Sequence, residues 1–327
     1  MYAGSMRCGG FVTVGGTITA LSPIAHGEPP VDPEKKNNNR PIRRITISAS
    51  GSFVPVPVVS SGHLTHLFRT LLVRDALKKA GVTDEQMEKI RDKYPELYQT
   101  LFSGGTLEKK NQEAKTRKKR KDDLRSVFPD PETFTGLFYA NRLFGGAITW
   151  LDDIILESVV GVEHAWPLVQ EVAALRGLTA ADLQKHGMDI SPSSVLLNQV
   201  EPAVFTRMDE TAKGKKSEKN SEDAEDGRMI YHVEYVPAGT KFLHEMYVET
   251  KEDVVLILSA IRYLAEKLLT EHPFVGGLIK RGFGKVKFDY TLPEKWGERD
   301  VKAEVYEEYV NGNARKIREK IDKMMSV

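Results

Sequence analysis

Hydrophobic and polar positions alternate in the first part of the chain, which predicts β-strands. Residues 11–21 (FVTVGGTITAL) are rich in β-branched residues and alternate, and the turn-forming sequence SPIAHG follows them. Shorter alternating segments follow at 43–48 and 52–59. Between the first of these strands and the second, residues 28–40 are rich in Pro, Asn and Lys, which favours a loop.

Helical periodicity begins directly after these strands. Ser60-Ser61-Gly62 is a helix-start sequence, and Leu64, Leu67, Leu71 and Leu72 then share one face of a helix over 63–79. Further helical patterns lie at 83–102, 166–176, 180–185, 254–269 and 301–324. Two more apolar segments, 134–143 and 148–160, are expected to be buried and to be joined by Phe144-Gly145-Gly146.

The region between 195 and 248 predicts a long β-arm. Residues 195–208 favour an extended chain, and 211–226 contain almost no apolar residue and are expected to be disordered. Alternating segments at 231–237 and 241–248 flank Ala238-Gly239, which indicates a hairpin. Without its helical insertion, the element order is compatible with a split βαβ–βαβ sheet and an α+β fold.

The composition limits the class of protein. A chain of 327 residues with 40% hydrophobic residues can bury a sizeable core, and its formal net charge is only +1. Any surface for nucleic acid must therefore arise from segregated charge. A single cysteine, Cys8, excludes an internal disulfide framework. No apolar run approaches a membrane span and no signal peptide is recognisable, so we expect a cytoplasmic protein with no membrane partner.

The segment 276–288 (GGLIKRGFGKVKF) is the strongest candidate in the sequence for a ligand-binding loop. Its four glycines allow sharp turns, and successive free N–H groups in such a loop form a concavity for anions. Its four cations are Lys280, Arg281, Lys285 and Lys287. Two interpretations remain open: a loop that holds a nucleic-acid backbone, or a tight turn with solvated lysines. The same choice applies to residues 109–121, with eight basic residues and one acid.

Five segments, in this order along the chain, together resemble one protein family. They are TITALSPIAHG at 17–27, VPVPVVSSGHLTHLFRTLLVR at 54–74, LFGG at 143–146, TRMD at 206–209 paired with EYVPAGTKF at 234–242, and the glycine-rich segment 276–287. The chain resembles the RAMP superfamily of CRISPR-associated proteins, and within it the backbone subunit that polymerises along guide RNA. It looks most like the type IV backbone subunit, followed by type III.

This resemblance implies a palm with an RRM-like or ferredoxin-like fold, a helical insertion and a β-hairpin thumb. The implied divisions are 6–75 for the first part of the palm, 76–192 for the insertion, 193–232 for the thumb with its tip at 211–227, 233–292 for the rest of the palm, and 293–327 for a C-terminal helix.

The resemblance also implies contacts to RNA. Ser60, Ser61 and Gly62 would place free amides of a helix N-terminus on a phosphate. Phe205 and Met208 of the thumb would enter between bases while Arg207 holds a phosphate, although ordinary hairpin packing is the alternative. The remaining predicted RNA-binding residues are Arg43, Arg44, His63, His66, Arg69, Gly277, Lys280, Arg281, Gly282, Phe283, Gly284 and Lys285.

Catalysis is not the favoured interpretation. Type III backbone subunits cut target RNA with an aspartate in the loop after the first strand, and Asp32 is the one aspartate between 28 and 40. It lies among three prolines with no visible partner, so we assign no catalytic residue. His26, His63 and His66 lack an accompanying HExxH motif, and Walker A and GxSxG sequences are absent.

The sequence thus favours a guide-RNA (crRNA) binding subunit without cofactor or metal. Its expected partners are guide RNA, complementary target nucleic acid, copies of itself in a filament and other CRISPR effector subunits. The alternatives are a metal-dependent RNA nuclease that uses Asp32, and a general single-strand RNA-binding protein.

Overall fold

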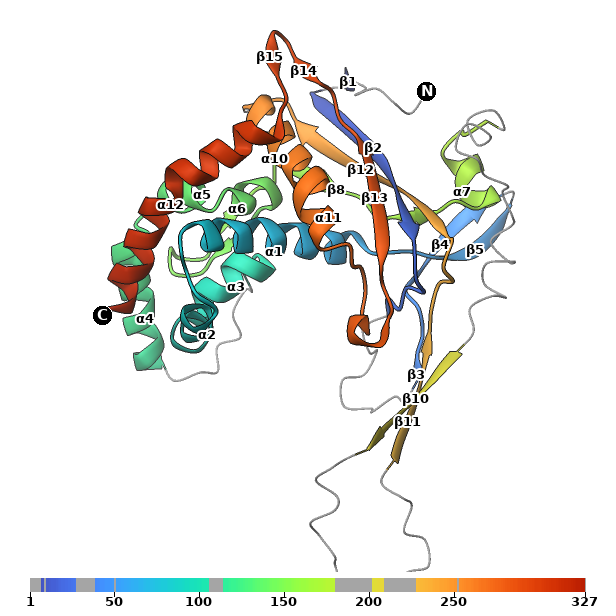
Figure 1. Cartoon of the computed structure of the whole chain (residues 1–327), viewed down its shortest axis with the longest axis horizontal. Helices are drawn as coiled ribbons and strands as arrows, with labels where there is room; N and C mark the ends of the chain where they lie inside the picture. Colours follow the sequence, from blue (N-terminus) through green and yellow to red (C-terminus); the bar gives the residue numbers. More distant parts are fainter. Residues whose placement is uncertain are drawn as a thin grey trace, which may run out of the picture.

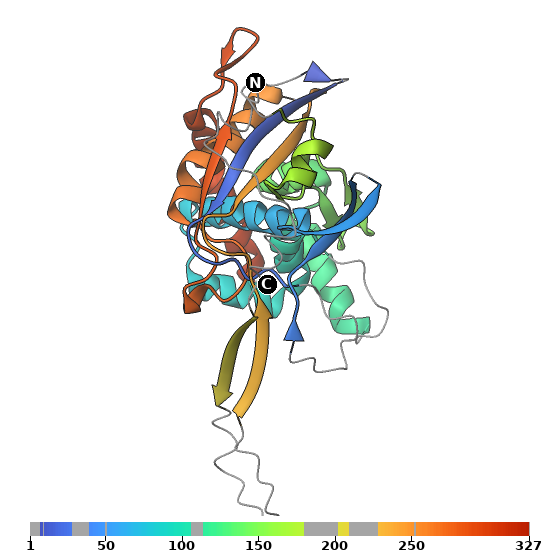
Figure 2. The ribbon, with the colours of Figure 1, turned by 90° about the vertical axis from the view of Figure 1, so that its right-hand side faces the viewer.

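The fold was taken from a computed structural model, which describes residues 7–8, 10–27, 39–49, 51–105, 114–179, 202–208, 228–251 and 253–326. A twisted sheet forms one side of the molecule and a group of helices the other, with helix α1 running from the sheet into the helical side (Figure 1). A two-stranded arm extends away from the body, as the view turned by 90° also shows (Figure 2). The predicted α+β class is confirmed.

The main sheet is antiparallel and centred on β2 (Phe11–Ala20). One edge of β2 pairs with β12 (Lys241–Glu249) and the other with β13 (Val286–Thr291). The far edge of β12 pairs with β8 (Val160–Val162) and β9 (Trp166–Pro167). Along β12, buried side chains alternate with half-buried ones, as expected for a strand with one face on a core.

One point in the sheet requires glycine. A Cβ at Gly16 would lie 2.4 Å from Cδ1 of Tyr290 and 2.5 Å from the carbonyl oxygen of Asp289. Gly16 in the middle of β2 therefore lets β13 approach closely. β1 (Arg7–Cys8) pairs with the start of β2.

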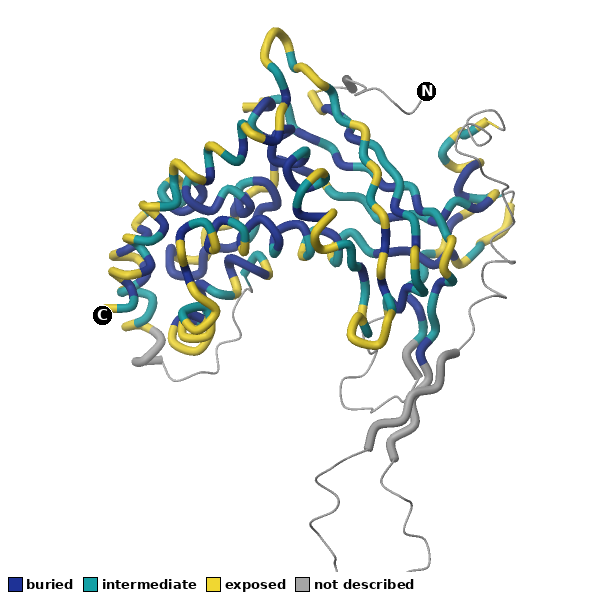
Figure 3. Tube along the Cα trace, viewed as in Figure 1, coloured by how far each residue is buried: buried dark blue, intermediate teal, exposed yellow. Residues whose placement is uncertain are grey.

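Helices complete the core. α1 (Ser61–Lys79) contributes Leu64 and Phe68, both fully buried in the same hydrophobic cluster as Val12 and Ile18 of β2. α10 (Val254–Tyr263) continues through a π-helical turn, η2 (Leu264–Leu268), into α11 (Leu269–Glu271), as predicted for 254–269. α12 (Ala303–Met325) packs on α1 and α10, with its outer face exposed (Figure 3).

The helical side also holds the insertion. Its elements there are α2 (Asp84–Lys93), α3 (Pro95–Ser103), α4 (Ala114–Val127), α5 (Pro131–Leu137), α6 (Tyr139–Phe144) and the strand pair β6 (Gly146–Ile148) and β7 (Ile154–Leu156). A further helix, α7 (Gln170–Leu175), lies on the sheet side next to β4 (Arg44–Ala49) (Figure 1). The predicted helix 83–102 is two helices, because Pro95 starts a new one at its first position. Of 166–176, only the last part is helical, since Trp166 and Pro167 join the sheet.

Three further strand pairs lie outside the main sheet. They are β4 (Arg44–Ala49) with β5 (Ser52–Pro57), β10 (Pro202–Met208) with β11 (Arg228–Glu234), and β14 (Lys295–Trp296) with β15 (Arg299–Asp300). β3 (Asn39–Arg40) adds to β11. The antiparallel β10–β11 pair is the predicted arm; residues 180–201 and 209–227, where the rest of that prediction falls, are outside the described residues.

The predicted hairpin around Ala238-Gly239 is wrong. β11 pairs with β10 and β3, whereas β12 pairs with β2, β8 and β9. Val236 forms a bridge with Ile24, and the N–H of Gly239 donates to the carbonyl of Ala20. These contacts hold the turn against the end of β2, so the chain passes from the arm into the main sheet.

No helix among the described segments combines the length and apolarity needed to cross a bilayer.

Candidate nucleic-acid interface

The glycine-rich segment is a compact loop at the end of the sheet from which the arm extends (Figure 1). It contains a short 3₁₀ helix, η3 (Ile279–Arg281), flanked by Leu278 and Gly282 in left-handed conformations. Gly276 and Gly284 also have positive φ, at 83° and 80°. The loop then enters β13, which confirms the predicted strand after it.

Backbone bonds fix this loop to its surroundings. The N–H of Gly277 donates to the carbonyl of Ala25 at 2.7 Å, and that of Gly284 to the carbonyl of Pro23 at 2.7 Å. The N–H of Gly276 donates to Nε2 of His63 at 2.9 Å. The predicted row of free amides is therefore wrong at these positions, because each amide already has a partner.

The cationic side chains of the loop face solvent. Lys280, Arg281 and Lys285 are exposed. Lys280 and Lys285 make no ion pair with any residue that the structure describes. Lys287 lies 3.9 Å from Asp289, with both side chains well exposed, which is a weak pair in water. The loop therefore offers cations on a fixed backbone.

The N-terminus of α1 is occupied by histidines. Ser60 caps the helix, since its Oγ accepts from the N–H of His63 at 3.4 Å. The N–H of Ser60 donates to Nε2 of His26 at 3.1 Å, and the N–H of Ser61 donates to Nδ1 of His164 at 2.9 Å. The first amides of the helix are not free, contrary to the prediction. Gly62 is exposed, with open space around it.

These hydrogen bonds require neutral imidazoles, because a protonated ring nitrogen cannot accept. Burial, followed by the charges of His63, Arg43 and His164, lowers the pKa of His26 from 6.5 to about 4. Burial also lowers the pKa of His63 and of His164. The rings of His26 and His63 lie 4.9 Å apart between centroids. The cluster links the first turn, α1, the segment after β8 and the glycine-rich loop.

Two predicted arginines lie beside this cluster. Arg43 is half-buried, and its charge acts on both His26 and His164. Arg44 forms a 2.8 Å ion pair with Glu234 at the end of β11. Glu234 also accepts the N–H of Ile42 at 2.9 Å, so Arg44 helps to fasten the base of the arm.

The side chains of His66 and Arg69 contact the helical side of the molecule. The Nδ1 of His66 lies 2.9 Å from the carbonyl oxygen of Phe102. Arg69 is only 5% exposed, and its Nη2 donates to the carbonyl oxygens of Phe144 and Gly145 at 2.8 and 3.0 Å. Burial and these bonds argue against the predicted phosphate contact of Arg69. It instead fixes the LFGG segment.

Several predicted residues or their side chains lie outside the described part of the chain. Asp32 and residues 109–113 of the basic run lie outside the described residues, as do the side chains of Phe205, Arg207 and Met208, although their backbone forms part of β10. In the later part of the run, Lys118 and Lys119 are exposed, whereas Arg120 pairs with Glu96 at 2.9 Å.

The sequence interpretation missed two residues of this region. His164 contacts the N-terminus of α1 from a segment 103 positions further along the chain, and no local pattern in the sequence predicts this contact. Tyr235 follows the arm strand β11, and its ring lies 5.7 Å from that of Phe283. Its place within EYVPAG, directly after the arm, was the available signal.

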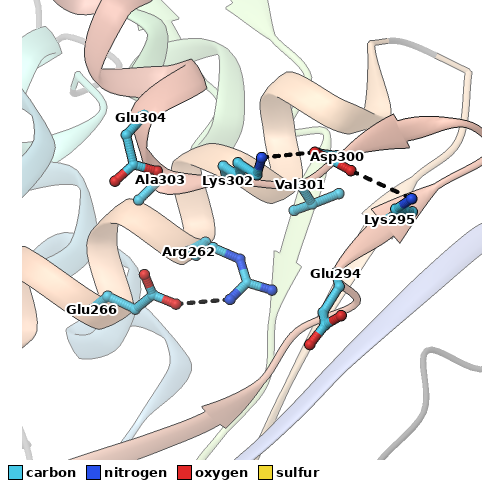
Figure 4. Close-up of a pocket in the computed structure, with 9 residues that line it drawn as sticks. All are labelled: Arg262, Glu266, Glu294, Lys295, Asp300, Val301, Lys302, Ala303 and Glu304. Atoms are coloured by element: carbon cyan, nitrogen blue, oxygen red, sulfur yellow. Dashed lines mark hydrogen bonds and ion pairs between the residues drawn. The ribbon is translucent and has the colours of Figure 1, made fainter.

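The hollow lined by Arg262, Lys295 and Lys302 does not resemble a nucleic-acid site. Figure 4 shows this hollow between α10 and the β14–β15 strands, where Arg262 bonds Glu266 at 2.8 Å and Asp300 pairs with Lys302 and Lys295. Arg262 also donates to the carbonyls of Leu292 and Pro293. The cationic side chains that line this hollow are therefore balanced by carboxylates. Among the described residues, no group of three or more His, Cys, Asp or Glu lies suitably for a metal ion.

No family model and no curated protein matches the chain. Among solved structures, it is similar to a chain described as "Type IV-B CRISPR Complex", at 16% identity and a TM-score of 0.49, over 88% of this chain and 96% of that one. It is also similar to Csc2 of Thermofilum pendens, at 13% identity and a TM-score of 0.39, over 96% and 80%.

Proposed function

We propose that this protein is a crRNA-binding backbone subunit of a CRISPR effector complex. The observation that supports this proposal best is the glycine-rich loop. Its backbone is tied to residues 23–25 and to His63, while Lys280 and Lys285 extend into solvent without an ion-pair partner among the described residues. A rigid loop with free cations can bind a phosphate backbone without selecting a base sequence.

The arrangement of strands is compatible with an RRM-like palm. In order of sequence, β2, β8, β12 and β13 would be the four strands of a split βαβ–βαβ sheet, and they lie in the order β13–β2–β12–β8. α1 follows β2 and α10 precedes β13, as such a fold needs. In this proposal the β10–β11 arm is the thumb, and Phe205 and Met208 separate neighbouring bases.

The proposed partners follow from this role. Copies would stack head to tail along the guide, a heterologous contact that makes an open filament. Guide RNA would supply specificity by pairing with a complementary target, other effector subunits would complete the assembly, and the complex would act in the cytoplasm. The protein itself would cut nothing.

We expect the double variant Lys280→Ala/Arg281→Ala to weaken binding to all guide sequences alike. Each lost single-strand phosphate contact should reduce the slope of log affinity against log salt by about 0.7, so the double variant should lose roughly one to two units. The slope can be measured by fluorescence anisotropy with a labelled guide. Arg315→Ala/Lys316→Ala, the same charge change on the exposed face of α12, is the matched control. An equal slope in both double variants would rule out contact between the loop and RNA.

The nuclease alternative predicts a different result. The assembled complex should leave labelled complementary RNA intact in the presence of magnesium. Regularly spaced fragments that disappear in Asp32→Ala would replace our proposal with a target-cleaving subunit. A general RNA-binding protein would instead purify with RNA of no discrete length, whereas a backbone subunit should retain a guide of defined length.

A further inference from the structure

Two aromatic rings meet where the arm joins the glycine-rich loop. Tyr235 directly follows arm strand β11, and Phe283 lies in the loop between Gly282 and Gly284. Their centroids are 5.7 Å apart and their planes are inclined by 76°, an edge-to-face arrangement. Both residues are half-buried.

This pair is separate from the hydrophobic core. Phe288 and Tyr290, a few residues further along the chain, pack against the core, but Tyr235 and Phe283 belong neither to the buried cluster nor to the hydrophobic residues packed on it. Within the described part of the chain, the hydrophobic core therefore does not include these two rings.

The backbone on both sides of the pair is fixed to one turn. Val236 and Ile24 exchange two hydrogen bonds of 2.9 Å, which anchors the residue after Tyr235. Gly284, after Phe283, donates to the carbonyl of Pro23 and accepts from the N–H of Val275 at 2.8 Å. Adjacent residues, Pro23 and Ile24, thus position the two rings. A preorganised pair loses little conformational entropy when it binds.

We propose that Tyr235 and Phe283 form a stacking platform for an unpaired nucleobase of bound RNA. In an edge-to-face pair, the ring that contributes its edge keeps both faces uncovered by its partner, and a base can stack there. Lys285, two positions from Phe283, is placed to meet the phosphate of the same strand. The platform rests on the proposed RNA-binding function and adds a base contact to it, at the point where the arm begins.

Photocrosslinking tests this directly in the unaltered protein. Single-stranded RNA that carries 5-iodouridine at one position in turn is bound, irradiated at long wavelength and digested, and the crosslinked peptides are sequenced. We expect crosslinks at Tyr235 or Phe283. If the protein binds the RNA and crosslinks form only elsewhere, the platform is wrong.

Variants of the two aromatic residues give a quantitative test. Removing a stacking partner should weaken binding about 10-fold with an unchanged salt slope, because no charge is lost. We expect this for Tyr235→Ala and Phe283→Ala, whereas Tyr235→Phe and Phe283→Tyr should bind nearly as the wild type does. Phe53→Ala, which removes an aromatic ring that is 81% exposed on the β4–β5 hairpin, is the control.

The outcomes separate this inference from the proposed function. Normal affinity in both alanine variants, with the wild-type salt slope, would overturn the platform and leave the phosphate-binding loop standing. Absence of any RNA binding by the wild type would overturn both.

Discussion

Gly284→Ala is expected to lower the free energy of unfolding by roughly 2–4 kcal/mol. Gly284 has φ of 80°, where any residue with a Cβ is strained by about 1 kcal/mol or more. A Cβ there would also lie 2.2 Å from the carbonyl oxygen of Val275, so one of two hydrogen-bonded backbone segments must move. Forced displacement of a packed segment adds roughly 1–3 kcal/mol.

Two other glycines isolate these effects. Gly282 has φ of 85° but open space around it, so Gly282→Ala should show only the conformational cost, about 1 kcal/mol. Gly312, inside α12 with open space, should tolerate alanine or gain up to about 1 kcal/mol. Urea unfolding midpoints give the comparison. If Gly284→Ala were no less stable than Gly282→Ala, the contact with Val275 would be too soft to fix the loop.

Local signals in the sequence predicted most elements. The helix start at Ser60 was predictable because a serine and a glycine precede an apolar periodicity, and Ser60 is the N-cap. The alternation over 11–21 similarly predicted β2, and the long apolar pattern after Asp253 predicted α10 and its continuation. Each of these patterns depends only on residues that are close together in the sequence.

Pairing between distant segments could not be predicted in the same way. Residues 231–237 and 241–248 carry a good hairpin pattern, yet β12 pairs with β2, which begins 230 positions earlier in the chain. Alternation shows that a strand has one buried face, but not which edge it meets. Arg69 illustrates the same limit, since a basic residue within a motif is consistent with either RNA contact or an internal bond to Phe144.

The amides at the α1 terminus show how tertiary structure changes a local prediction. A helix N-terminus attracts anions when its N–H groups are unpaired. Here His26 and His164, from two other segments, accept from the first two of those groups. The cations of the glycine-rich loop, rather than the helix terminus, are therefore the stronger basis for the proposed RNA binding.

Acidification is expected to destabilise the fold through its histidines. His26 accepts from Ser60 in its neutral form, and its pKa is lowered from 6.5 to about 4. His244 is 1% exposed and its Nδ1 lies 2.7 Å from the hydroxyl oxygen of Tyr290; burial lowers its pKa to about 3. The unfolded chain binds these protons first as the pH falls. Stability is therefore complete above about pH 6.5 and declines toward pH 4.

The variant His26→Gln should reduce this decline. The contribution of His26 alone corresponds to a loss of about 2 kcal/mol between roughly pH 7 and pH 4.5. Glutamine does not titrate, and its side-chain oxygen can accept the N–H of Ser60, so His26→Gln should remain folded and lose about that much less on acidification. His26→Ala also does not titrate, but it leaves that amide unpaired and should be less stable at every pH. Urea unfolding across this pH range gives the comparison. If His26→Gln and the wild type declined in parallel, the proton would not compete with the Ser60 hydrogen bond, and His26 could not link acidity to the region that joins α1 and the glycine-rich loop.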